Sequence, residues 1–133
     1  MLALVWQAGS ASMCNPIWTR CREFAAADLI LCRSGASTMA ELGAAGRASL
    51  LVPFALAADD HQRRNAEVFL QAGAACMLTE AELGDPERLL NVLAVLLADP
   101  AGLRVMGERA RTLARPDAAH KIASIIVQLA HRA

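Results

Sequence analysis

The sequence has 133 residues, a usual size for one domain, and such a chain can bury roughly two-thirds of its unfolded surface around a single core. Thirteen basic and thirteen acidic residues cancel, which argues against a nucleic-acid partner bound through a broad basic surface. No apolar run reaches the roughly 20 residues of a membrane span. We therefore expect one domain over residues 1–133.

Short apolar runs alternate with helical segments up to Leu78. The expected strands are Leu2–Trp6, Leu29–Cys32, Ser49–Val52 and Ala75–Leu78, and the expected helices between them are 18–26, 37–45 and 60–71. Runs that are apolar at every position are typical of strands buried on both faces, and helices between them supply parallel crossovers. The pattern predicts an α/β fold with a parallel sheet flanked by helices.

The last third of the sequence is predicted to be helical. Asp85-Pro86 and Asp99-Pro100 each place a capping residue before a proline, which is typical of a helix start. The second of these helices is expected to end near Arg115, and a third begins at Pro116-Asp117. In that third helix, apolar residues recur at helical spacing and predict a face that packs back on the domain. They are Ile122, Ile125, Ile126 and Leu129.

The four cysteines lack the close pairing of a metal or redox motif. They are Cys14, Cys21, Cys32 and Cys76. Cys32 lies inside an apolar run and Cys76 follows two alanines, so both are interpreted as small buried apolar residues. We expect reduced thiols of a cytosolic protein, in preference to disulfides or metal ligands.

The segment Cys32–Glu41 carries the most chemical information. A buried strand runs into Ser34-Gly35 and then directly into a helix, an arrangement that points free backbone N–H groups at the carboxyl edge of the sheet. Such an edge suits a diphosphate, with hydroxyl groups nearby to add donors and Glu41 placed to accept from ribose hydroxyls. The alternative is an ordinary helix start in which Ser37 is the N-cap and nothing binds.

Several blocks of this sequence resemble the donor-site signature of the MurG family of UDP-GlcNAc-dependent glycosyltransferases. The blocks are Ala27–Gly35 with Thr38 and Glu41, Ala44–Gly46, Val52–Phe54, Ala58–Gln62 with Asn65-Ala66, and Gln71–Ala75. The similarity runs from Pro16 to the C-terminus, in the family's order and spacing, and Trp6–Gly9 resembles a further strand-ending element more weakly.

This resemblance implies the C-terminal half of a GT-B glycosyltransferase, whose two Rossmann-like domains face each other across a cleft. The family transfers GlcNAc from UDP-GlcNAc to the 4-hydroxyl of the muramyl sugar of lipid I, which gives lipid II for peptidoglycan. The implied reaction is inverting, independent of metal and without a cofactor. The lipid-linked acceptor is held by the N-terminal half, which implies a cytoplasmic location at the inner face of the plasma membrane.

The resemblance also implies a role for particular residues. Ile17 would meet the uracil edge through its backbone, and Glu41 would bind the ribose hydroxyls. The diphosphate would lie among Ser34, Gly35, Ala36, Ser37 and Thr38, and the GlcNAc hydroxyls would be reached by His61, Gln62 and Asn65. No catalytic residue is assigned to this half.

Three side chains, those of Ile17, His61 and Arg33, have an alternative interpretation. Ile17 could be simple core. His61, after Asp59-Asp60, could be a solvated helix start at which the acids favour the helix dipole. Arg33 could neutralise phosphate, or could extend along the surface with only its head in water.

The sequence departs from the family at its N-terminal side. The acceptor-binding domain and the Gly-Gly-Ser phosphate loop are missing, and Trp18-Thr19 replaces an acidic pair. Because residues between Gly9 and Pro16 are too few for the family's helix and strand, we expect that the first parallel βαβ unit cannot form as usual. We therefore expect a truncated or separately encoded donor domain, inactive alone, which needs a partner that bears the acceptor site. A eukaryotic pair of proteins divides the architecture in this way.

Three functions remain open at this point. The chain could be the donor half of an inverting GlcNAc transferase, a UDP-sugar-binding module without catalysis, or a nucleotide-free structural domain. In the third case it would form dimers through an unpaired edge of the sheet.

Overall fold

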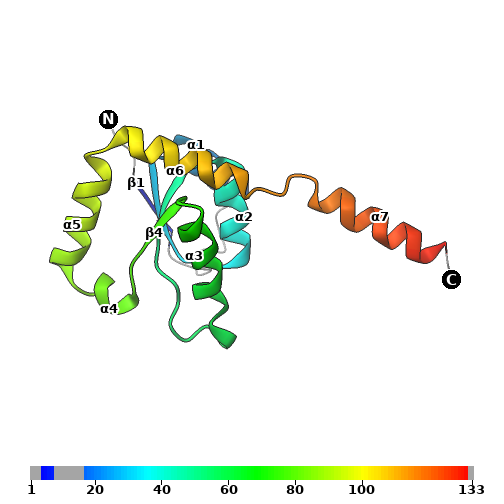
Figure 1. The fold of residues 1–133 in the computed structure, drawn as a ribbon, viewed down its shortest axis with the longest axis horizontal. Coiled ribbons are helices and arrows are strands. Elements are labelled where there is room, and N and C mark those ends of the chain that lie inside the picture. Colours follow the sequence, from blue (N-terminus) through cyan, green and yellow to red (C-terminus); the bar gives the residue numbers. More distant parts are fainter. Residues whose placement is uncertain (1–3, 8–16, 132–133) are drawn as a thin grey trace.

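The computed structural model describes residues 4–7 and 17–131, with side chains described for 22–131. Its centre is a parallel sheet surrounded by helices (Figure 1). The strand order is β1-β2-β3-β4. The strands are β1 (Leu4–Gln7), β2 (Leu29–Cys32), β3 (Ala48–Leu51) and β4 (Ala75–Met77). The predicted α/β fold with a parallel sheet is confirmed.

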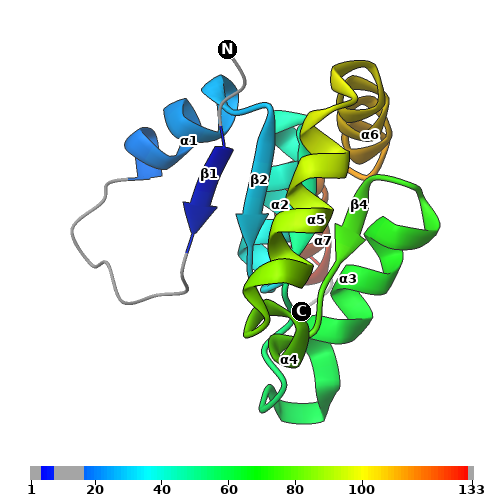
Figure 2. The same cartoon turned by 90° about the vertical axis from the view of Figure 1, so that its left-hand side faces the viewer.

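Helices connect the strands and then continue beyond the sheet. The crossovers are α1 (Ile17–Ala26), α2 (Ala36–Ala45) and α3 (His61–Gln71), the last of which follows the short 3-10 turn Ala58–Asp60. After β4 come α4 (Glu80–Leu83), α5 (Pro86–Leu97), α6 (Pro100–Thr112) and α7 (Ala118–Ala130). Figure 2 shows α5 crossing one face of the sheet, with α2 and α3 on the other side.

The strands are apolar throughout because both of their faces are covered. Leu29 and Leu31 pack with Leu103 of α6 and with the apolar side of α5. Ile30 and Cys32 point the opposite way and pack with side chains of α1, α2 and α3. Alternate residues of a strand point to opposite faces, so a two-sided core requires an uninterrupted apolar run.

Most helix boundaries follow from local chemistry that the sequence displays. Asp85 accepts hydrogen bonds from the amides of Glu87 and Arg88, as a capping residue before an N1 proline should. Gly73 follows α3 with a φ of 65°, the left-handed conformation in which glycine commonly ends a helix. Helix α4 was not predicted, although its reciprocal Thr79–Glu82 capping box is visible in the sequence.

The expectation for the first crossover is wrong. Strand β1 pairs in parallel with β2, from Leu4 opposite Leu29 to Gln7 opposite Cys32, and α1 lies between the two strands in the sequence. The physical reason is that α1 itself serves as the crossover helix, so the chain from β1 to β2 is long enough for a parallel connection. Residues 8–16 lie outside the described part of the chain.

The expectation that α7 packs back on the domain is also wrong. Figure 1 shows α7 extending away from the sheet and its covering helices. Its large aliphatic side chains are between 53% and 61% exposed, and they are Ile122, Ile125, Ile126, Val127 and Leu129. Helical spacing establishes that an apolar face exists, but it carries no information about what covers that face.

Candidate functional site

The candidate site lies at the carboxyl edge of the sheet. Strands β2, β3 and β4 all end at this edge, where they continue into the start of α2, the β3–α3 loop of residues 52–60, and α4 (Figure 2). In open parallel sheets ligands bind at this edge, because loops from neighbouring strands meet there.

The start of α2 has no side-chain cap. Gly35 is the N-cap residue, in an extended conformation with φ −65° and ψ 151°, and among the described residues no side chain makes a capping hydrogen bond to the first turn. The alternative with Ser37 as the N-cap is wrong, because the helix begins at Ala36 and Ser37 is already inside it. The first-turn amides at this edge are therefore available to an anion.

Ser34 joins the start of α2 to the start of α3. Its side chain is buried, and its hydroxyl donates to the Gln62 carbonyl at 2.8 Å. The Asn65 side-chain amide donates to the Ser34 carbonyl at 3.0 Å. These two bonds fix the two helix starts against each other, while Ser37 is exposed and Thr38 is partly exposed at the same edge.

Glu41 lies half-buried on α2 and close to the end of β2. Burial raises the pKa of the Cys32 thiol to about 12, and the nearby negative charge of Glu41 adds to that increase. The carboxylate of Glu41 therefore lies beside the carboxyl end of β2, about one turn after the uncapped start of α2.

The β3–α3 loop ends in two residues with unusual backbone angles. Asp59 and Asp60 have φ values of 52° and 54°, in the left-handed region that residues other than glycine seldom adopt. Directly after them, His61 donates from Nδ1 to the Ala58 carbonyl at 2.7 Å, so that in a neutral imidazole Nε2 is the acceptor nitrogen. Gln62 accepts from the Phe54 amide through Oε1 at 3.0 Å. His61 is exposed and Gln62 is half-buried. The side chain of Asp60, the N-cap residue of α3, makes no capping hydrogen bond.

Glu80 belongs to this edge and was missed by the sequence analysis. It lies on α4, and its carboxylate contacts Arg33 at the end of β2 and the amide of Ala55 in the β3–α3 loop. The only available signal was the capping box that starts α4, because nothing in the sequence pairs Arg33 with a residue so far along the chain. Ile17 is the first residue of α1, and its side chain lies outside the described residues.

Residues 22–122 match the family model of the glycosyltransferase family 28 C-terminal domain. The chain belongs to this family. A UDP-N-acetylglucosamine--N-acetylmuramyl-(pentapeptide) pyrophosphoryl-undecaprenol N-acetylglucosamine transferase of Xanthomonas axonopodis pv. citri (strain 306) is 58% identical over 105 residues, which are 79% of this chain and 24% of that protein. A transferase of the same name from Xylella fastidiosa (strain Temecula1 / ATCC 700964) is 52% identical over 102 residues, 77% of this chain and 28% of that protein.

The crystal structure of Acinetobacter baumannii MurG shows the same fold as this family 28 domain. It is similar with a TM-score of 0.73 and 34% sequence identity, and the match covers 80% of this chain and 30% of that one. The resemblance drawn from the sequence, and the C-terminal GT-B half that it implies, are confirmed. The chain spans about a quarter of the length of the curated relatives that it matches.

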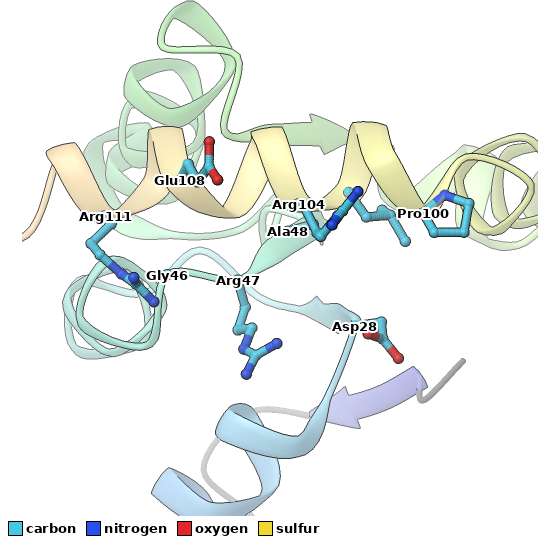
Figure 3. Close-up of a pocket in the computed structure, with 9 residues that line it drawn as sticks. Asp28, Gly46, Arg47, Ala48, Pro100, Arg104, Glu108 and Arg111 are labelled. Carbon is cyan, nitrogen blue, oxygen red and sulfur yellow. The ribbon is translucent and has the colours of Figure 1, made fainter. Parts of the chain in front are cut away.

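A hollow at the opposite, amino-terminal edge of the family 28 sheet is lined by residues that stabilise the fold. Arg47 donates to the Ala25 carbonyl at the end of α1, and Arg111 donates to the Ala45 carbonyl at the end of α2. Figure 3 shows these two arginines pointing towards the ends of those two helices, with Asp28 also lining the hollow. Cations at helix C-termini complement the dipole, so these arginines have a structural role.

Metal and membrane features add little within the described residues. There, no group of three or more His, Cys, Asp or Glu side chains is placed to hold a metal ion. No single described helix is long and apolar enough to cross a membrane. Helices α5 and α6 together have the length and composition of a span, but they are bent by 89° relative to each other. Cys32 is buried and Cys76 half-buried, both as free thiols, while the side chains of Cys14 and Cys21 lie outside the described residues.

Proposed function

We propose that this chain is the UDP-GlcNAc-binding half of a family 28 transferase that moves GlcNAc to the lipid-linked muramyl acceptor of peptidoglycan synthesis. The transfer is inverting and needs no metal, and it converts lipid I to lipid II. Support comes from the two transferases named above. This chain is 52–58% identical to them over a segment that makes up 24–28% of their length.

The observation that carries the proposal is the uncapped start of α2. Within the part of the chain that the structure describes, Gly35 leaves the first-turn amides without a side-chain cap, and a Cβ added at that position would meet nothing within 4 Å. A helix start that faces open space at the carboxyl edge of a parallel sheet suits the diphosphate of a nucleotide sugar. Ala36, Ser37 and Thr38 line this anion position, and Ser34 supports it from the buried side.

The remaining donor contacts are assigned around that position. Glu41 accepts hydrogen bonds from the ribose hydroxyls, and the backbone of Ile17 meets the uracil. His61, Gln62 and Asn65 meet the GlcNAc hydroxyls. Because Gln62 and Asn65 each use one side-chain atom within the protein, Gln62 has Nε2 left to donate and Asn65 has Oδ1 left to accept.

The acceptor is supplied by a partner, either the remainder of a longer protein or a separate subunit. Transfer requires removal of a proton from the acceptor hydroxyl, and we assign no general base to this chain. Orientation of the acceptor in such a reaction is worth roughly 7–11 kcal/mol, so its absence abolishes detectable turnover. The complex would act at the cytoplasmic face of the plasma membrane, where the partner holds the lipid.

Ligand titration of the purified chain tests the donor site. UDP and UDP-GlcNAc should raise the melting temperature in a concentration-dependent way, and UDP-GlcNAc should act more strongly than UDP-glucose. Glu41→Ala should weaken UDP binding by about 1.5–3 kcal/mol, the range for a hydrogen bond to a charged group. If saturating UDP leaves both melting and calorimetric signals unchanged, the chain is a structural domain and this proposal is wrong.

A further inference from the structure

Arg33 extends from the end of β2 into the β3–α3 loop. Its Nη1 donates to the carbonyls of Val52 at 3.2 Å and Pro53 at 3.4 Å. The guanidinium carbon lies 5.5 Å from the centre of the Phe54 ring, within the range of a cation–π contact. A single side chain therefore contacts three consecutive residues at the start of the loop.

Glu80, on α4, contacts the same loop and Arg33. Its Oε1 lies 2.6 Å from Nη2 of Arg33, and its Oε2 accepts from the Ala55 amide at 3.1 Å. The two side chains are 26% and 31% exposed, so the ion pair is partly shielded from water. Together, Arg33 and Glu80 connect β2, α4 and residues 52–55 of the loop.

The β3–α3 loop needs such support because it ends in two residues with a strained backbone. It runs into Asp59 and Asp60, both left-handed, and then into His61. Non-glycine residues stay in that region only when the surroundings determine their conformation. The fixed contacts along residues 52–55 hold one end of this strained segment, and the start of α3 holds the other.

Arg33 is poorly placed to neutralise a phosphate. Its charge is already balanced by the carboxylate of Glu80 at 2.6 Å, and its Nη1 donates to two backbone carbonyls. An anion at the start of α2 would compete with an existing ion pair and with three further contacts. The geometry therefore favours a role through the loop over direct contact with the diphosphate.

We propose that Arg33 and Glu80 are positioning residues for the donor sugar, which hold the β3–α3 loop so that His61 and Gln62 meet GlcNAc while neither Arg33 nor Glu80 touches the ligand. This inference rests on the proposed function for its ligand, but the loop contacts can be tested without any ligand.

The first measurement is amide hydrogen exchange at Phe54 and Ala55 in the ligand-free chain, resolved by NMR. Glu80→Ala should speed exchange at Ala55 by at least about tenfold, because an amide that loses its acceptor becomes locally open. Arg33→Met should speed exchange in the same direction, because it removes the ion pair that holds the Glu80 carboxylate at the loop. Glu80→Gln keeps an acceptor for Ala55 and should restore most of the protection. Lys121→Met and Asp117→Ala break an ion pair at the start of α7, away from the loop, and as controls they should leave both amides unchanged.

The second measurement compares calorimetric affinities for UDP and UDP-GlcNAc. The affinity gained by adding the sugar should fall about five- to tenfold in Arg33→Met and in Glu80→Ala, as expected for one or two lost hydrogen bonds. The affinity for UDP itself should change less than about twofold, since the start of α2 is untouched. A general loss of structure would instead weaken both ligands and lower the melting temperature.

Two results would overturn the inference. Unchanged exchange at Ala55 in Glu80→Ala would show that the carboxylate does not hold the loop. A large loss of UDP affinity in Arg33→Met, with none in Glu80→Ala, would make Arg33 a diphosphate ligand. If the wild-type chain binds neither UDP nor UDP-GlcNAc, the proposed function is wrong, and so is the proposal that these residues position a sugar. The exchange measurement would still show whether Arg33 and Glu80 hold the loop.

Discussion

At the scale of single residues, Gly35 is a position where the fold does not require glycine but a bound ligand would. Its φ of −65° and ψ of 151° suit any residue, and a Cβ added there would meet nothing within 4 Å. The fold therefore does not require glycine at this position. A diphosphate that approaches the backbone closely would require it.

Gly35→Ala should consequently leave the fold intact and weaken UDP binding. Stability should stay the same or rise by about 0.4–1 kcal/mol, because alanine restricts the unfolded chain at a conformation it can adopt. Urea unfolding and UDP calorimetry on the same protein give the two quantities. Undiminished UDP affinity would mean that the diphosphate does not approach this residue.

Glu80 gives the β3–α3 loop a specific dependence on pH. The hydrogen bond from the Ala55 amide and the adjacent Arg33 guanidinium hold the pKa of this carboxyl below its ordinary value. Because the folded pKa is lowered, the stabilising contacts are complete above the ordinary glutamate range and are lost as pH falls through the lowered value.

The amide chemical shifts of Phe54 and Ala55 should therefore change on acidification with a midpoint below the ordinary pKa of a glutamate. An NMR titration between about pH 7 and 3 measures this transition. Glu80→Gln is the control and should abolish the step. A transition at the ordinary value, or an unaltered one in the variant, would contradict the ion-paired state described here.

Sequence reasoning at this scale found residues that lie near each other in the chain. The stretch Ser34–Glu41 was identified because a strand, a glycine and a helix follow one another directly. The Arg33–Glu80 pair was missed because the two side chains meet only after the strand order and the position of α4 are fixed. The buried position of the Ser34 hydroxyl also depends on α3, which its own neighbours do not predict.

At the scale of elements, α6 packs closely on the turn between α2 and β3. Gly46 ends α2 with a φ of 61°, and a Cβ on Gly107 of α6 would lie 2.5 Å from the Gly46 carbonyl oxygen. That neighbour is backbone and cannot move aside as a flexible side chain could. The absence of a side chain at Gly107 therefore sets how closely α6 approaches the sheet.

Gly107→Ala should destabilise the domain by about 1–3 kcal/mol, the usual cost of overpacking a core contact. The direction is informative because alanine favours helices over glycine by about 1 kcal/mol, so propensity alone predicts the opposite result. Urea denaturation measures the change, with Gly35→Ala as a control at an open position. Equal or greater stability would show that α6 can shift away from Gly46 at little cost.

The elements also show which patterns determine structure. Strands β2 and β3 were predictable because burial on both faces demands apolar residues at every position. The parallel pairing of β1 with β2 was not predicted. The sequence analysis counted only the residues between Gly9 and Pro16 and did not consider α1 as the crossover helix. The position of α7 was not predictable either, since an amphipathic pattern identifies a face and leaves its partner open.

At the scale of the whole molecule, the chain matches the equivalent of about a quarter of its curated relatives. The features assigned to the donor lie at one edge of one sheet, and they consist of a helix start, a carboxylate and a fixed loop. Such a surface can bind and orient a nucleotide sugar and stabilise its leaving group. It contains nothing that we assign to the acceptor hydroxyl.

The purified 133-residue chain should therefore bind UDP-GlcNAc but transfer no GlcNAc to a lipid I analogue, even at saturating donor. The reason is geometric, because an acceptor that is not oriented forfeits roughly 7–11 kcal/mol of the barrier reduction. Addition of the acceptor domain of a family member in trans should restore measurable turnover in a radiolabelled GlcNAc assay. Glu41→Ala in the same mixture should lower that turnover in step with its loss of UDP affinity. Robust transfer by the chain alone would place an acceptor site within these residues, and it would make His61, with its free Nε2, the first candidate for the general base.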